Sequence, residues 1–266
     1  MLDIAELSAG VDAVIIDCRF VLGKPDAGRE QYLAGHIPGA HYLHLEEDLS
    51  GPVGRHGGRH PLPQPDQLAA RLAGLGIGLE TPVVAYDDSR FAFAARFWWL
   101  LRALGYRPPR LLNGGYQAWV AAGGAVSTTV PVPRPCPQPA VGDYRGYCGI
   151  EDLSQLQAAG AVLLDSREPR RFAGLEEPID PVAGHIPGAL NVPWQRVSDD
   201  QGRLRDAAAL AEHFAAVPEG SQRVVYCGSG VSACVNLYAL AQLGDTEALL
   251  YPGSWSDWCT YLPAPD

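Results

Sequence analysis

Short runs of apolar, often β-branched residues alternate along the chain with longer segments whose apolar residues recur every three or four positions. The short runs are typical of buried strands, and the longer segments are typical of amphipathic helices. Their alternation predicts an α/β fold in which a mainly parallel sheet is flanked by helices. The predicted strands are 13–17, 82–86, 110–112, 161–165, 223–226 and 248–251, and the predicted helices are 65–73, 91–104, 207–216 and 231–243.

The second half of the chain repeats motifs of the first half. The hexapeptide GHIPGA occurs twice without change, at 35–40 and at 184–189. Three other pairs of similar segments occur in the same order: 14–19 with 162–167, 83–89 with 224–229, and 113–119 with 252–258. Matched segments in a conserved order indicate a duplicated domain.

A proline-rich segment separates the two copies. Proline occupies every second position from Pro131 to Pro139, which excludes a helix or a central strand and favours an extended polyproline conformation. We therefore predict an N-terminal domain over 1–124, a linker over 125–145 and a C-terminal domain over 146–266. Each copy has the usual size of a domain, roughly 100–150 residues.

Composition and charge exclude several classes of protein. The chain has 266 residues, 47% of them hydrophobic, and its 30 acidic and 20 basic residues give a net charge of −10. This balance argues against a disordered chain and against a nucleic-acid binder, which needs a basic patch. No apolar run approaches the roughly 20 residues that cross a bilayer, and residues 1–12 lack the basic residues of a targeting peptide. We expect a soluble, cytoplasmic protein that binds any anionic substrate through local groups.

One of the six cysteines stands apart from the others. Cys227 follows a predicted strand and begins the loop Cys227-Gly228-Ser229-Gly230-Val231-Ser232, which leads into a predicted helix. Ligands of α/β sheets bind at this end of a strand. The glycines allow successive backbone amides to turn inward beside the helix N-terminus, and such a nest would stabilise a thiolate or a terminal persulfide. Nucleotide-binding and metal-binding motifs are absent from the sequence, so we expect no cofactor and no metal.

The paired copies, the repeated GHIPGA and the segment CGSGVSA at 227–233 resemble the tandem-domain rhodanese sulfurtransferases, and most closely their 3-mercaptopyruvate branch. The resemblance covers essentially the whole chain and implies two rhodanese-like domains. It implies that the first domain is catalytically silent, because Asp87 occupies the place of Cys227. It also implies that Cys227 takes sulfane sulfur from thiosulfate or 3-mercaptopyruvate as a persulfide and passes it to cyanide or to a thiol, for example of a thioredoxin-like partner.

The resemblance implies roles for further residues. Ser229, His36 and Asp26 would protonate the enolate that leaves when mercaptopyruvate gives up its sulfur, and Arg171 would bind the anionic donor. The backbone of Gly228, Gly230, Val231 and Ser232 would hold the persulfide. Ile179 stands where the family has a second arginine, which leaves thiosulfate or another persulfide donor open.

Other interpretations of these residues remain. His36 and its twin His185 in the repeated GHIPGA can share a structural turn role, and Asp26 can be a helix N-cap. A cysteine phosphatase would need an arginine where the loop has Ala233, and a non-catalytic rhodanese pair could bind a partner through the loop. His56 and His60 lie in a glycine-rich stretch that we interpret as a solvated loop.

Overall fold

The computed structural model describes residues 1–262, so the last four residues of the predicted C-terminal domain lie outside the described part of the chain. The chain forms two compact units. Unit 1 contains Met1–Gly51, Pro63–Arg145 and Ser198–Leu204, and unit 2 contains Pro52–Leu62, Gly146–Val197 and the residues from Arg205 on. The proline-rich linker belongs to unit 1, which extends to Arg145. Two short segments also pack with the unit of the other half, which the contiguous domains of the sequence analysis did not include.

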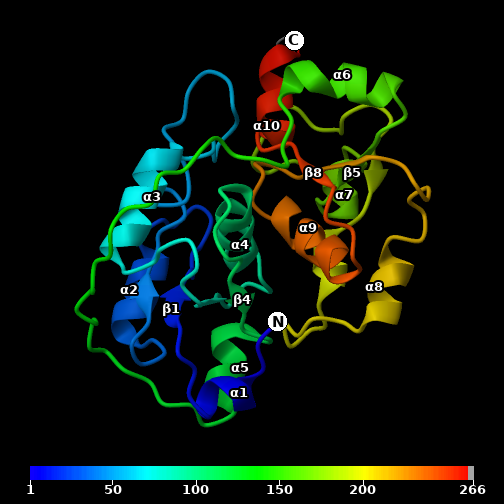
Figure 1. The fold of residues 1–266 in the computed structure, drawn as a ribbon. Coiled ribbons are helices and arrows are strands. Elements are labelled where there is room, and N and C mark those ends of the chain that lie inside the picture. Colours follow the sequence, from blue (N-terminus) through cyan, green and yellow to red (C-terminus); the bar gives the residue numbers. More distant parts are fainter. Residues whose placement is uncertain (263–266) are drawn as a thin grey trace. The chain divides into compact units, whose positions relative to one another are not determined.

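Unit 1 is a parallel four-stranded sheet with helices around it (Figure 1). Its strand order is β2-β1-β3-β4, and α4 packs on β3 and β4. The strands are β1 (Val14–Asp17), β2 (His41–Tyr42), β3 (Val83–Tyr86) and β4 (Arg110–Leu111), and the helices are α1 (Ile4–Ser8), α2 (Ala27–Ala34), α3 (Pro65–Gly74), α4 (Ala94–Ala103) and α5 (Gly115–Ala121).

Unit 2 repeats this topology with the parallel order β6-β5-β7-β8, and α9 packs on β7 and β8. The strands are β5 (Val162–Asp165), β6 (Leu190–Asn191), β7 (Arg223–Tyr226) and β8 (Leu249–Leu250), and the helical segments are α6 (Ile150–Ala158), α7 (Pro169–Phe172), η1 (Trp194–Val197), α8 (Ala207–His213), α9 (Ala233–Gln242), α10 (Ser254–Trp258) and η2 (Cys259–Tyr261). The predicted α/β class is confirmed. The short strands β2 and β6 are not among the predicted strands, whereas the equally short β4 and β8 are.

The same buried ion pair explains why Asp-x-Arg and GHIPGA occur in both halves. In unit 1, the Arg19 guanidinium binds the Asp17 carboxylate at 2.6 Å and donates to the Gly35 carbonyl at 2.7 Å. In unit 2, Arg167 makes the corresponding contacts with Asp165 and with Gly184, at the same two distances. Each pair thus joins the end of the first long strand of its unit to the GHIPGA turn. Losing one partner would leave a buried charge uncompensated.

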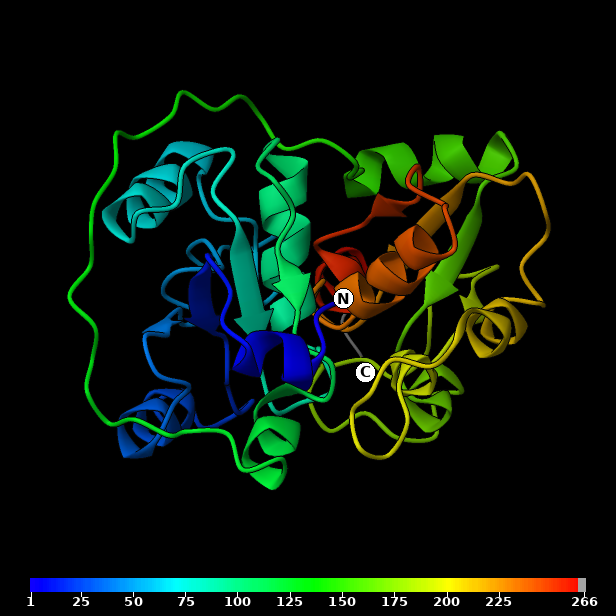
Figure 2. The ribbon, with the colours of Figure 1, turned by 60° about the horizontal axis from the view of Figure 1, so that its bottom comes forward.

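The proline-rich linker forms no helix or strand between residues 128 and 145. Figures 1 and 2 show it as an extended trace along the outside of unit 1. Isolated backbone hydrogen bonds hold it there, from Cys136 to Ala73 and from Arg145 to Ala103, both 2.9 Å long. Its extended conformation is what the alternating prolines predict.

Within residues 1–262, no helix combines the length and the apolar character that crossing a bilayer requires.

Candidate functional site

Cys227 lies directly after β7 in unit 2, at the carboxyl end of the sheet, as the sequence predicts. Its backbone amide donates to the Ser254 hydroxyl at 3.1 Å, and its carbonyl accepts from the Trp255 amide at 3.0 Å. The residue is 2% exposed. The segment that begins α10 therefore holds the backbone of Cys227 in place.

The loop after Cys227 needs its two glycines for different reasons. Gly230 has φ +72°, and a β-carbon there would lie 2.3 Å from the Pro252 carbonyl oxygen. Gly228 has no such φ, but a β-carbon there would lie 3.1 Å from a nitrogen of Arg59 and 3.5 Å from nitrogens of Arg171. Gly230 therefore permits the sharp turn, and Gly228 leaves room for two guanidinium groups beside the cysteine.

The loop amides have capacity to bind an anion. Across residues 1–262, the backbone N–H groups of Ser229, Val231 and Ser232 donate to no acceptor of the protein. They precede α9, a helix of ten residues whose N-terminus carries partial positive charge. Free backbone amides at a helix N-terminus can bind an anion. This loop follows directly on Cys227.

Arg171 belongs to a network of buried charges beside the loop. Its Nη2 lies 2.6 Å from Glu177 Oε1 and 3.1 Å from Asp180 Oδ2. The Arg59 guanidinium pairs with the other oxygen of Asp180. Arg171, the predicted anion-binding residue, therefore lies next to the cysteine loop. Asp180 joins it to Arg59. Ile179 is 48% exposed and supplies no charge to this network.

The two carboxylates of the network respond differently to their surroundings. Burial raises the pKa of Asp180 above its ordinary value, and the charge of Arg59 offsets part of that rise. Burial also acts to raise the pKa of Glu177, but hydrogen bonds from Arg171 and from the Asp180 amide outweigh it, so the Glu177 pKa is lowered. Glu177 is thus the firmly ionised partner of Arg171.

A histidine that the sequence analysis passed over contacts the predicted Ser229. His60 Nδ1 lies 2.8 Å from Ser229 Oγ, and His60 is 4% exposed. The interpretation of this stretch as a solvated loop is wrong for residues 57–60, because the Gly57 amide donates to Asp257 and the Arg59 amide to Ser256. The only sign of this role in the sequence is that Arg59 and His60 stand together between two glycines and a proline.

His36 and Asp26 have structural surroundings in unit 1. His36 is fully buried, with Nδ1 2.8 Å from the Tyr32 carbonyl and Nε2 3.1 Å from the Thr129 carbonyl. Its twin His185 has Nδ1 2.7 Å from the Phe172 carbonyl, and both rings stack on the aromatic residue that supplies that carbonyl. These matched contacts are what a shared turn role predicts. Asp26 is exposed and stands at the N-cap of α2 without a side-chain capping bond.

The counterpart of the cysteine loop in unit 1 is closed on itself. Both oxygens of the Asp87 carboxylate accept hydrogen bonds from backbone amides that follow it. The donors are Ser89, Phe91, Phe93 and Ala94, at 2.9–3.0 Å. The side chain of Asp87 therefore occupies the place of a bound anion.

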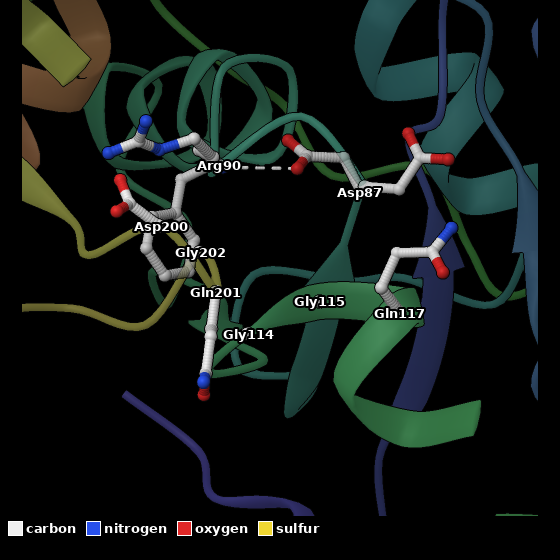
Figure 3. A pocket seen from close by; sticks show the side chains of 10 residues that line it. Asp87, Arg90, Gly114, Gly115, Gln117, Asp200, Gln201 and Gly202 are labelled. Atoms are coloured by element: carbon white, nitrogen blue, oxygen red, sulfur yellow. Dashed lines mark hydrogen bonds between the residues drawn. The ribbon is translucent and has the colours of Figure 1, made fainter. Parts of the chain in front are cut away.

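A cavity of about 150 Å³ lies beside Asp87 and is lined by Arg90, Gln117 and Gln201, among others (Figure 3). Arg90 has φ +57° where the other loop has Gly230, and its side chain donates to Ser198. Among the described residues, no group of His, Cys, Asp and Glu side chains could hold a metal ion.

The comparison with protein families matches this architecture. The model of the rhodanese-like domain matches residues 3–122 and again residues 150–261. The two matches fall on the two halves of the chain.

Several known proteins are similar over nearly the whole chain. The probable 3-mercaptopyruvate sulfurtransferase of Pseudomonas aeruginosa is 46% identical, over 94% of this chain and 90% of that protein. The putative thiosulfate sulfurtransferase SseB of Mycobacterium tuberculosis is 43% identical, over 95% and 89%. The solved 3-mercaptopyruvate sulfurtransferase of Leishmania major superposes with a TM-score of 0.88 at 31% identity, over 97% of this chain and 73% of that chain. With its two matched domains and these relatives, the chain belongs to the tandem-domain rhodanese family of sulfurtransferases.

Proposed function

We propose that the chain moves sulfane sulfur from 3-mercaptopyruvate or thiosulfate to cyanide or a thiol through a persulfide on Cys227. The Cys227 thiolate attacks the donor sulfur. The carbon–sulfur bond of mercaptopyruvate breaks to release the enolate of pyruvate, or the sulfur–sulfur bond of thiosulfate breaks to release sulfite. The acceptor then attacks the outer sulfur and returns the Cys227 thiolate.

The observation that carries this proposal is the position of Cys227 beside the unpartnered amides of Ser229, Val231 and Ser232. Free amides at the start of α9 would stabilise the negative outer sulfur of a persulfide. Gly228 and Gly230 give this loop its shape.

The hydrogen-bonded pair of Ser229 and His60 would supply the proton that the leaving enolate needs. Arg171, held by Glu177 and Asp180, would bind the oxyanion of the donor. In this proposal His60 takes the role that the resemblance assigned to His36, because the ring nitrogens of His36 face backbone carbonyls. Asp26 has no part in it.

Intact mass spectrometry tests the proposal. We expect wild-type protein incubated with 3-mercaptopyruvate or thiosulfate to gain the mass of one sulfur atom, and cyanide to remove it. The Cys227→Ser variant should gain nothing, whereas Cys234→Ser, altered at another buried thiol of unit 2, should still gain it. If wild-type protein gains no sulfur from either donor, the proposed function is wrong and a binding role for the loop is favoured.

A further inference from the structure

We infer that Arg59 is the second cation that holds the oxyanion of the sulfur donor. This inference rests on the proposed function and extends it to a residue from the first half of the sequence. Arg59 belongs to the segment Pro52–Leu62, which packs within unit 2. It would replace the charge that is missing at Ile179.

The first support is that two donor groups face the same point. A methyl group in place of the Gly228 hydrogen would lie 3.1 Å from Arg59 Nη2 and 3.5 Å from Arg171 Nη1. Each of these nitrogens lacks a hydrogen-bond partner within residues 1–262, while other nitrogens of both guanidinium groups bind carboxylates. Two free N–H groups thus converge over the residue that follows Cys227. Two guanidinium groups can hold a carboxylate or a sulfonate-like group there.

The second support is that Arg59 is fixed in this position. One terminal nitrogen pairs with Asp180, whose side chain is 2% exposed, and the Arg59 amide donates to the Ser256 hydroxyl at 3.1 Å. Gly58, with φ +79°, packs against the Gly253 carbonyl, where a β-carbon would lie 2.4 Å away. The Arg59 side chain is therefore oriented before a sulfur donor binds, so it loses little conformational entropy on binding.

Variants of Asp180 and of Arg59 should change the affinity for the anionic donor in opposite directions. Its carboxylate binds both guanidinium groups, so it orients them and also competes with an incoming anion for their charge. Removing Arg59 should weaken anion binding. Neutralising Asp180 as Asp180→Asn keeps a hydrogen-bond acceptor but removes the competing charge, and should strengthen anion binding. A purely structural role for Arg59 predicts that both changes are neutral or harmful.

Binding can be measured apart from sulfur transfer in the Cys227→Ser background. By calorimetry with 3-mercaptopyruvate and with thiosulfate, we expect added Arg59→Ala to raise the dissociation constant about tenfold to a hundredfold, the effect of losing one charge-assisted hydrogen bond. Arg59→Lys should give an intermediate value, and Asp180→Asn should lower the dissociation constant. Arg55→Ala, an exposed position in the same segment with the same change of charge, should leave it unchanged.

Steady-state rates with Cys227 intact provide the second measurement. Arg59→Ala should raise the KM of the donor, while the rate at which a preformed persulfide passes to cyanide stays that of the wild type. Unchanged donor binding in the Arg59→Ala variant, with its fold verified by thermal unfolding, would overturn the inference. This outcome differs from failure of the proposed function, in which the wild-type protein itself forms no persulfide.

Discussion

The two loops that follow β3 and β7 occupy the same place in the same topology but differ in how their backbone amides are satisfied. In unit 1 the Asp87 carboxylate turns back and takes up the amides of its own loop. In unit 2, Cys227 begins a loop whose amides at Ser229 and Val231 have no partner in the described chain. One loop satisfies its donors with its own side chain, and the other leaves them without an acceptor in the described chain.

The difference shows how one copy of a duplicated domain can keep its fold with an aspartate in place of the cysteine. Four buried amides without an acceptor would be costly, and the Asp87 carboxylate satisfies them all. Burial raises the pKa of Asp87, and the amide hydrogen bonds offset part of that rise. The Asp87 carboxylate thus stabilises the backbone of its own loop.

The largest effect is expected when the nucleophile is moved between the loops. Asp87→Cys in the Cys227→Ser background should transfer sulfur at least about a thousandfold more slowly than the wild type. The new thiol would lie next to the Asp88 carboxylate, where the other loop has Gly228, and a carboxylate repels an anionic donor. Initial rates with thiosulfate and 3-mercaptopyruvate measure this. Recovery of substantial activity would break the comparison, because the two loops would then be chemically equivalent.

Removing the internal anion should destabilise unit 1. Asp87→Ala leaves the amides of Ser89, Phe91, Phe93 and Ala94 without their acceptor, and we expect it to lower the free energy of unfolding by about 3 kcal/mol. Urea unfolding measures the change. Asp88→Ala is the matched control, because the Asp88 carboxylate accepts from the Ser89 hydroxyl at 3.4 Å and from none of the four amides that Asp87 binds, so the change should alter stability by less than about 1 kcal/mol. Equal effects of the two variants would contradict the role of Asp87 as the internal anion.

Removing the Ser229 hydroxyl should slow the reaction with one sulfur donor more than the reaction with the other. Ser229→Ala should lower kcat with 3-mercaptopyruvate by about tenfold to a hundredfold, because the leaving enolate loses its proton donor. With thiosulfate the effect should be smaller, because sulfite leaves without a proton. Ser89→Ala, at the equivalent position of the silent loop, is the control and should leave both rates unchanged. Equal losses with both donors would point to a structural role for Ser229.

The smallest effect concerns the pH dependence of the charges around Arg171. The Glu177 pKa lies below its ordinary value of 4.5, so ionised Glu177 stabilises the folded state above about pH 4.5, and this contribution is lost as the pH falls through the lower folded pKa. Glu177→Gln should therefore lower the melting temperature at pH 7 by a few degrees, and by less in acid. Glu176→Gln, at an exposed ion pair with Arg170, should change it little at either pH. A melting-temperature difference between wild type and Glu177→Gln that grows in acid would contradict this prediction.

The local sequence was enough to predict much of the fold and the place of Cys227 directly after a strand. The apolar runs predicted the long strands of both sheets to within one or two residues at each end, and β7 without error, because buried parallel strands are continuous in sequence. The strand-to-helix loop around Cys227 could be identified for the same reason. The repeated GHIPGA and Asp-x-Arg motifs indicated the duplication, although the hydrogen bonds from the motif arginines to the Gly35 and Gly184 carbonyls could not be derived from the sequence.

Partners far apart in sequence were the part that reasoning from sequence missed. His60 and Arg59 precede Ser229 and Asp180 by more than a hundred residues, and no periodicity connects them. A histidine in the more conspicuous GHIPGA motif was assigned the role instead, and its surroundings at Tyr32 and Thr129 showed that it is buried within unit 1.

The sequence by itself determined the duplicated α/β fold, the extended linker and the position of Cys227, because strand periodicity, proline stereochemistry and a glycine loop are local properties. Only the tertiary structure decided which charges gather around that cysteine. The segment Pro52–Leu62 packs with unit 2, and this packing brings Arg59 and His60 to the loop. Side chains that meet through chain packing are specified by the whole set of contacts that stabilise the fold, and no single stretch of sequence carries that information.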